Sequence, residues 1–195
     1  MKRFIITGTP GSGKTSIIRQ LELQGFSVVE EAATDVIADA QSEGISEPWR
    51  DLSFIDAIAR LQKDRETRSS DPHVGVQFCD RSVVCTAALA RYLGYPLSPF
   101  LNAELERILN KSVYEKQVFF VRNLGFITPT CARRISFEDS LRFEAIHEQT
   151  YNSFGFELIY IEPGTVTERA EAIQAALLSS KSSASTPSPV TNTRC

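Results

Sequence analysis

The sequence predicts an α/β protein in which helices cover both faces of a five-stranded parallel sheet. Five short apolar runs alternate along the 195-residue chain with segments whose apolar residues recur at helical spacing. The run at 117–121 is of the kind that a parallel strand covered on both faces shows. Alternating strands and helices imply right-handed crossovers, and ligands of such sheets lie outside the carboxyl ends of the strands. The residues that follow each strand are therefore the candidates for a functional site.

Residues that interrupt or cap helices mark where the individual elements begin and end. Helical segments end at Gly44 and Gly94, and Asp71-Pro72 breaks a third one. Ser53 and Ser136 stand at helix starts, where a hydroxyl can accept a backbone N–H. The strands are expected at 4–6, 26–29, 74–79, 117–121 and 156–161. The helices are expected at 14–24, 32–43, 53–69, 83–93, 100–109, 136–154 and 167–178.

The chain is expected to form one domain followed by a tail. Residues 1–178 contain all the periodic segments, and their number suits one domain with a sizeable core. Residues 179–195 are rich in Ser, Thr and Pro and have a single valine. Because such a segment cannot bury enough apolar surface to offset the entropy of ordering, we expect the tail to be disordered.

A glycine-rich loop stands between the first strand and the first helix. Residues 8–15 read G-T-P-G-S-G-K-T, a G-x-x-x-x-G-K-T pattern in its strand, loop and helix setting. Backbone N–H groups of such a loop and the helix dipole create a positive hollow that fits the phosphates of ATP. We expect Lys14 to reach the β and γ phosphates and the Thr15 hydroxyl to join the shell of a Mg²⁺ ion. The loop residues expected to bind the nucleotide are Gly8, Thr9, Pro10, Gly11, Ser12, Gly13, Lys14, Thr15 and Ser16. The pattern predicts a P-loop NTPase.

An acid and a basic residue follow the third strand. Asp80 stands where P-loop proteins place the acid that holds Mg²⁺, directly or through water. The structural alternative is a cap for the helix that follows, a role for which Ser82 is equally suited. Arg81 is expected either to contact phosphate or to pair with Asp80 or a neighbouring Glu.

Two acids follow the second strand. A carboxylate at this position could accept a proton from a substrate hydroxyl as it attacks the γ-phosphoryl group. The alternative is that Glu30 and Glu31 are first-turn acids favoured by the helix dipole. Because only one of them is expected to point into the cleft, we favour Glu31 as the base and leave Glu30 as the other choice.

Residues 123–135 show neither helical nor strand periodicity and contain two adjacent arginines. An aperiodic stretch of about a dozen residues is usually functional or disordered. A lid that holds Arg133 and Arg134 could close on the triphosphate, exclude water and neutralise charge that develops during transfer. The alternative is a solvated basic turn. Four residues fall in segments that could line an acceptor pocket, although core or surface packing is the favoured role for each: Trp49, Arg50, Tyr92 and Tyr95.

Composition and missing motifs exclude several classes. The net charge of −3 and the absence of an aromatic-interleaved basic pattern give no support for nucleic-acid binding. Four cysteines form no C-x-x-C pair, and no apolar stretch has membrane-spanning length or resembles a signal peptide, so we expect a soluble cytoplasmic protein. The guanine motif N-K-x-D of GTPases is missing, as is room for the helical lid domain of ring-forming motors.

Several motifs together carry a family resemblance. Beside the phosphate loop, the chain has V-V-E-E-A-A-x-x-V-I, C-D-R-S, R-R-I-S-F-E-D, a late Tyr151 and G-F-E-L at 155–158. This combination resembles the AAA-type ATPase domain family that includes the nicotinamide riboside kinase domain of NadR. More distantly, D-R-S resembles the D/E-R-S motif of deoxynucleoside kinases, in which an acid at the end of the second strand is the base.

The resemblance implies a five-stranded, kinase-like P-loop core that binds Mg-ATP and has a lid. By position, the phosphate loop of the family corresponds to residues 13–15, its second acidic motif to Asp80 and Arg81, and its lid arginine to Arg134. One position departs from the family pattern. Where the family often has Glu-x-x-Arg after the second strand, Glu31 is here followed by Thr34, which counts against nicotinamide riboside as the acceptor.

The sequence thus favours an Mg-ATP-dependent phosphotransferase that acts on a small hydroxyl-bearing acceptor, nucleoside- or nucleotide-like. Lys14, Glu31, Asp80 and Arg134 would be its catalytic residues, with Arg81 and Arg133 in further contact with the nucleotide. Two alternatives stay open. The first is a nucleotide-operated switch or slow ATPase that signals to a protein partner through its lid or tail, and the second is an ATP-binding protein without turnover.

Overall fold

A five-stranded parallel sheet forms the centre of the molecule. The computed structural model describes residues 1–69, 73–126 and 135–182. The strands of this sheet follow the order β2-β3-β1-β4-β5 and are all parallel. Their bounds are β1 (Lys2–Thr7), β2 (Ser27–Val29), β3 (Val76–Asp80), β4 (Gln117–Val121) and β5 (Glu157–Ile161). The predicted fold class is confirmed, and the carboxyl ends of all five strands lie at one edge of the sheet.

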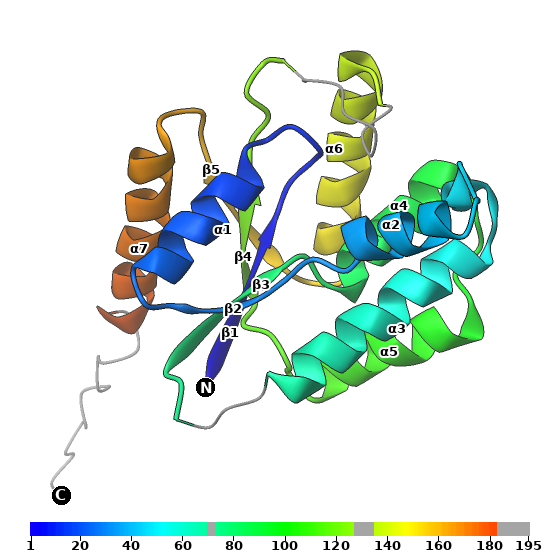
Figure 1. The fold of residues 1–195 in the computed structure, drawn as a ribbon. Coiled ribbons are helices and arrows are strands. Elements are labelled where there is room, and N and C mark those ends of the chain that lie inside the picture. The colour runs from blue at the N-terminus through cyan, green and yellow to red at the C-terminus, as the bar shows by residue number, and fades with distance from the viewer. Residues whose placement is uncertain (70–72, 127–134, 183–195) are drawn as a thin grey trace, which may run out of the picture.

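Helices cover both faces of the sheet. Figure 1 shows α1 and α7 on one side, and the group α2 to α6 on the other. The first pair is α1 (Lys14–Leu23) and α7 (Val166–Ser182). The second group is α2 (Ala33–Ser42), α3 (Ser53–Arg68), α4 (Val83–Leu93), α5 (Pro99–Asn110) and α6 (Phe137–Ser153), with the 3-10 turn η1 (Pro48–Arg50) before α3.

Alternate residues of the central strand enter two separate cores. Phe4 and Ile6 pack with the apolar faces of α1 and α7, whereas Ile5 between them packs with the other helices. This division follows from the two-residue period of a strand, whose successive side chains point to opposite faces. The rings of Phe4 and Phe119 lie 5.8 Å apart between centroids in the first core. A central strand buried on both sides is what places the phosphate loop, directly after it, on a rigid support.

The bounds of most elements differ from the predicted ones by one or two residues, and the end of α7 differs by more. Ser53, expected as the cap of α3, is its first residue, and the carboxylate of Asp51 accepts its backbone N–H at 2.7 Å. Asp and Ser are both good capping residues, which is why the sequence alone could not decide which of them serves this helix start. Helix α7 continues to Ser182 and does not end at Leu178. At Ser136 the prediction is confirmed, because its hydroxyl accepts the Asp139 N–H at 3.0 Å.

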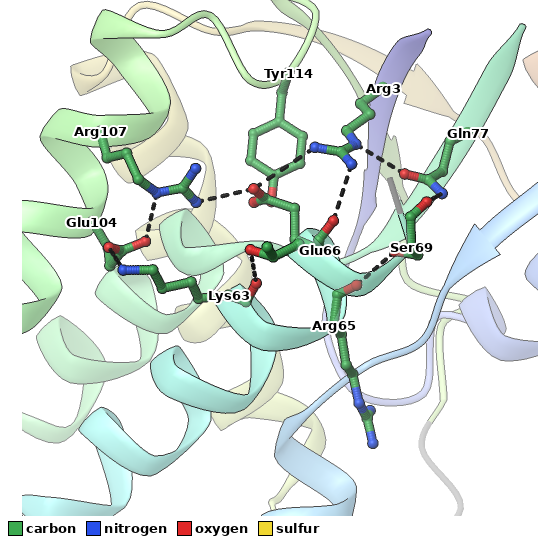
Figure 2. Close-up of polar contacts among 10 residues, drawn as sticks. Arg3, Lys63, Arg65, Glu66, Ser69, Gln77, Glu104, Arg107 and Tyr114 are labelled. Atoms are coloured by element: carbon green, nitrogen blue, oxygen red, sulfur yellow. Dashed lines mark hydrogen bonds and ion pairs between the residues drawn. The ribbon is translucent and has the colours of Figure 1, made fainter. Parts of the chain in front are cut away.

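A buried polar cluster lies near the amino ends of the strands, away from the phosphate loop. Figure 2 shows Glu66 of α3 at its centre, among Arg3, Arg107 and Tyr114. The Tyr114 hydroxyl donates to Glu66 Oε2 at 2.7 Å, and Arg107 Nη2 donates to Oε1 at 3.0 Å. Arg3 of β1 donates to the Glu66 carbonyl at 3.0 Å and, through Nε, to Gln77 of β3 at 2.9 Å. The cluster therefore fixes the end of α3 against the sheet and against α5.

Replacement of Glu66 by glutamine is expected to lower the free energy of unfolding by about 1–3 kcal/mol, because two guanidinium groups lose a buried, charge-assisted partner. Urea denaturation followed by circular dichroism measures the change. Glu115→Gln is the matched control, since Glu115 is 37% exposed and meets Lys2 only at 3.9 Å. Equal midpoints for Glu66→Gln and the control would contradict the expected role of the cluster.

Candidate active site

The phosphate loop joins the end of β1 to the start of α1 and needs glycine at two positions for physical reasons. Gly8 has φ of 152°, and a Cβ there would lie 2.5 Å from the carbonyl oxygen of Val121, so no larger residue fits. Gly13 has φ of 80° at the amino end of α1, in the left-handed region that glycine adopts without strain. The loop thus lies close to the β4 backbone and presents main-chain N–H groups at the start of α1, where anions bind favourably.

Lys14 and Asp80 form a buried ion pair beside this loop. Lys14 is the first residue of α1 and Asp80 is the last residue of β3, the strand that pairs with β1 next to Ile6. The Lys14 ammonium donates to Asp80 Oδ1, and the two residues are 5% and 6% exposed. Burial raises the pKa of Asp80, and the positive charge of Lys14 opposes that rise only in part. Asp80 is therefore directed toward the phosphate loop and lies within reach of its lysine.

The capping role that the sequence left open for Asp80 belongs to Ser82. The Ser82 hydroxyl accepts the Val84 N–H at 3.2 Å at the start of α4. Between the two residues, Arg81 has φ of 68°, a left-handed conformation that is costly for a residue with a side chain. Strained residues of this kind cluster at functional sites, where the surrounding structure holds them in place.

Glu31 faces Arg81 across the strand ends. Arg81 Nε donates to Glu31 Oε1 at 2.8 Å, and the Thr34 hydroxyl donates to Oε2 at 3.3 Å. Burial alone would raise the pKa of Glu31, but the charges of Arg81 and Lys14 and these hydrogen bonds lower it to about 2. Glu31 lines the cavity described below, whereas the neighbouring Glu30 is exposed. Thr34, the residue that departs from the family pattern, thus contacts the carboxylate that precedes it.

Arg65 of α3 holds the backbone that presents Glu31. Its guanidinium donates to the carbonyl oxygen of Glu31 and to the carboxylate of Asp35 in α2. The side chain of Glu31 and its main chain are therefore each fixed by an arginine. Neither contact could be derived from the sequence, because α3 lies far along the chain from the second strand.

A cavity of about 730 Å³ extends from the phosphate loop past Glu31 and Arg81. The part of the cavity away from the phosphate loop is mainly apolar. Trp49 and Tyr92, for which the sequence favoured a packing role, both line it. Gln62 of α3 lines it as well, is 2% exposed, and has an amide nitrogen without a hydrogen-bond partner among the described residues. The other apolar lining residues of this part are Ile37, Phe54, Ile58, Leu89, Leu93 and Phe143.

The residues around the phosphate loop fit Mg²⁺ bound together with phosphate. Thr15 is exposed and lines the cavity, and the Asp80 carboxylate, which does not line it, is buried in contact with Lys14, which does. Within the described ranges, no group of three or more His, Cys, Asp or Glu side chains could hold a metal by itself. Magnesium in nucleotide sites keeps several waters and takes one or two protein ligands beside the phosphates. One hydroxyl and one nearby carboxylate meet that requirement.

The structure does not test the two arginines of the predicted lid. Arg133 and Arg134 fall in 127–134, outside the described residues. The two segments that flank them, Gly125-Phe126 and Ile135 onward, both approach the cavity, since Phe126 and Ile135 line it. In the part of the chain that the structure covers, no helix has the length and apolar character to cross a membrane.

Comparison with solved structures identifies the fold. The NadR protein in complex with NAD and AMP-PNP matches 98% of this chain and 52% of its own, with 18% identity and a TM-score of 0.65. NadR in complex with NR matches with 17% identity and a TM-score of 0.65. Deoxyadenosine kinase from M. mycoides, described with the product dCMP, matches 91% of this chain and 99% of its own, with 15% identity and a TM-score of 0.59. These likenesses show a P-loop kinase-like fold.

The sequence comparison identifies the family. No curated protein matches the chain significantly by sequence. The chain spans about half the length of the NadR chains that it resembles. A family model described as "AAA domain" matches residues 3–169, which include the whole sheet except Lys2, the first residue of β1. The chain therefore belongs to the AAA domain family of P-loop proteins, as the resemblance in its motifs predicts.

Proposed function

We propose that this protein transfers the γ-phosphoryl group of Mg-ATP to a hydroxyl of a small nucleoside-type acceptor. The observation that carries the proposal is that one cavity is lined by the phosphate loop, by many apolar side chains and by both members of the Glu31–Arg81 ion pair. A protein that only switches on nucleotide binding has no need of a chamber for a second small molecule. The cavity therefore favours phosphoryl transfer over a nucleotide-operated switch that acts on a protein partner.

The phosphate loop and Lys14 would bind the triphosphate. Lys14 would give up part of its contact with Asp80 to bind the β and γ phosphates, which carry more negative charge than one carboxylate. Thr15 and Asp80 would hold Mg²⁺, which would supply positive charge to offset that of the phosphates. Asp80 would act through a water molecule while it stays paired with Lys14. Arg133 and Arg134 would add positive charge from the lid, as the family resemblance implies.

Glu31 would orient the acceptor hydroxyl and accept its proton. Its low pKa of about 2 keeps it ionised at neutral pH, so it is always an acceptor of hydrogen bonds. A carboxylate of such low pKa is a weak base, but phosphoryl transfer passes through a loose transition state in which the hydroxyl loses its proton late. Orientation of the nucleophile is then the larger contribution. Arg81 would hold Glu31 and lie near the transferred group.

The chamber suits a flat, uncharged ring attached to a hydroxyl-bearing sugar. Trp49, Phe54, Tyr92 and Phe143 offer apolar and aromatic surface, which favours a planar ring. The buried amide nitrogen of Gln62 has no hydrogen-bond partner in the described ranges, and a carbonyl or ring nitrogen of the acceptor would satisfy it. The structural neighbours are described with NR and with dCMP, which supports an acceptor of the nucleoside class.

Release of ADP in the presence of acceptors tests the proposal. Purified protein with Mg-ATP is incubated with single nucleosides, nicotinamide riboside or nucleotides, and we expect at least one nucleoside to raise ADP release by about tenfold or more. Phosphate on the acceptor, detected by mass spectrometry, must equal the ADP formed. The Lys14→Ala protein is the control for a contaminating kinase. ADP release that no acceptor changes, but that a protein partner alters, would contradict the proposal and favour the switch.

A further inference from the structure

Arg169 connects the C-terminal helix to the phosphate loop. It lies near the start of α7, which packs beside α1 on the same face of the sheet (Figure 1), and it is only 4% exposed. Its Nη1 donates to the carbonyl oxygen of Ser12 at 2.7 Å, and its Nη2 donates to the carbonyl oxygen of Arg122 at 2.9 Å. One planar guanidinium therefore spans the phosphate loop and the end of β4. Nothing in the sequence pattern indicates this contact, which joins residues 157 positions apart.

The positive charge of Arg169 is buried with uncharged partners. Both oxygens that accept from its Nη atoms are backbone carbonyls, and its Nε has no partner among the described residues. Burial lowers the pKa of Arg169, and the negative charge of Glu162 only partly offsets this effect. A buried guanidinium without a bonded carboxylate is costly, unless an anion nearby compensates it. The anion that the phosphate loop is built to bind would be that compensation.

The contact also fixes the orientation of one peptide of the loop. In a trans peptide the C=O and the next N–H point in opposite directions. Because Arg169 holds the Ser12 carbonyl, the Gly13 N–H points away from Arg169, and Gly13 lines the cavity. Arg169 Nη1 lies 3.1 Å from the place that a Cβ on Gly13 would occupy, so the guanidinium packs directly behind this peptide. The charge and the peptide dipole are therefore aligned toward the cavity.

We propose that Arg169 is a positioning residue for nucleoside polyphosphates: it orients the Ser12–Gly13 peptide and places a buried positive charge behind the phosphate loop. The inference rests on the proposed binding of ATP at this loop. It predicts that the contribution of Arg169 grows with the number of phosphates on the ligand. A purely structural link between α7 and the sheet would affect ATP, ADP and AMP alike.

Isothermal titration with ATP, ADP and AMP tests the inference on full-length Arg169→Met. We expect the Kd of Mg-ATP to rise by about tenfold, that of Mg-ADP by less and that of AMP hardly at all. We also expect the loss of ATP affinity on raising salt to become shallower, because one cation near the phosphates is gone. Arg19→Met, which removes an exposed arginine of α1, is the control for net charge and should leave all three values unchanged.

Each other outcome decides against the inference. Equal losses for ATP, ADP and AMP in Arg169→Met, or none, would overturn the inference while leaving the proposed function intact. A wild-type protein that binds none of the three ligands would overturn both. If Arg169→Met does not fold, Arg169→Lys decides. One ammonium replaces the two-pronged guanidinium there, so the Kd of Mg-ATP should rise at least about threefold, and an unchanged value would overturn the inference.

Discussion

Replacement of Lys14 by methionine is expected to weaken Mg-ATP binding by about 100-fold. Charge-assisted hydrogen bonds contribute about 1.5–3 kcal/mol each, and Lys14 would contact two phosphates that no other residue of the loop approaches with a full charge. The phosphate loop itself would keep its backbone N–H groups, so binding is weakened and not abolished. Isothermal titration with Mg-ATP measures the change, and acceptor-stimulated ADP release should fall below detection.

The same substitution leaves the Asp80 carboxylate buried without its cation. Burial already raises the pKa of Asp80 above its ordinary value. Between the ordinary pKa and this raised pKa, the folded protein keeps the Asp80 proton that the unfolded chain has released. Stability of Lys14→Met should therefore decrease as pH rises above the ordinary pKa of an aspartate. Titrations are best made near pH 6, after thermal unfolding has shown that the variant is folded.

Lys63→Met is the matched control for Lys14→Met. Lys63 pairs with Glu104, which is 5% exposed in its side chain, so this variant also removes a cation from a buried carboxylate, although Arg107 remains bonded to Glu104 at 2.8 Å. Lys63 does not line the cavity, and its pair lies on α3 and α5, in the cluster of Figure 2. It should lower stability and leave the Kd of Mg-ATP unchanged. Equal ATP affinity in Lys14→Met and the wild type would contradict the proposed cradle.

The fold could be predicted from the sequence because its signals are local. Strand, loop and helix around residues 8–15 are specified by one motif, and β4 at 117–121 by one apolar run. The order of the strands and the edge at which they end then follow from general rules of parallel sheets. Only boundaries were shifted, most of them by one or two residues, and the largest shift is at the end of α7, which continues past Leu178.

The residues at the strand ends could be named from the sequence, but most of their partners could not. For Arg81, pairing with a neighbouring Glu was one of the roles expected, and the structure pairs it with Glu31. Gln62 gave one weak signal, a polar residue in the apolar stripe of α3, and Arg169 gave none. Such contacts join helices that are distant in the sequence, so only tertiary structure reveals them. Arg133 and Arg134 stay predictions.

Replacement of Glu31 by glutamine is expected to lower kcat with the acceptor by about 10²-fold, the lower end of the range that loss of a general base costs, because Glu31 is a weak base and glutamine keeps an oxygen that can orient the hydroxyl. Glutamine has the same size and keeps an oxygen for Arg81 Nε, so the geometry of the strand ends should persist. The Kd of Mg-ATP should change by less than about threefold, because Glu31 would contact the acceptor and not the triphosphate. Steady-state ADP release and isothermal titration measure the two quantities.

Glu30→Gln is the control for Glu31→Gln, since it changes the neighbouring exposed carboxylate in the same way. A fall of kcat in both variants would indicate an effect of charge at the strand ends and not a base at Glu31. A rise of KM alone in Glu31→Gln would make Glu31 a binding residue.

The pH dependence of stability distinguishes the contribution of the Glu31–Arg81 ion pair to folding from the role of Glu31 in catalysis. Because the folded pKa of Glu31 is lowered from 4.5 to about 2, the pair stabilises the wild type fully above pH 4.5. This contribution is lost as pH falls toward 2. Glu31→Gln lacks it, so its stability relative to the wild type should be lowest near neutrality and recover in acid. A difference in stability that stays constant across this pH range would show that the carboxylate does not stabilise the fold through Arg81. Any loss of kcat in Glu31→Gln would then reflect the lost contact between Glu31 and the acceptor hydroxyl.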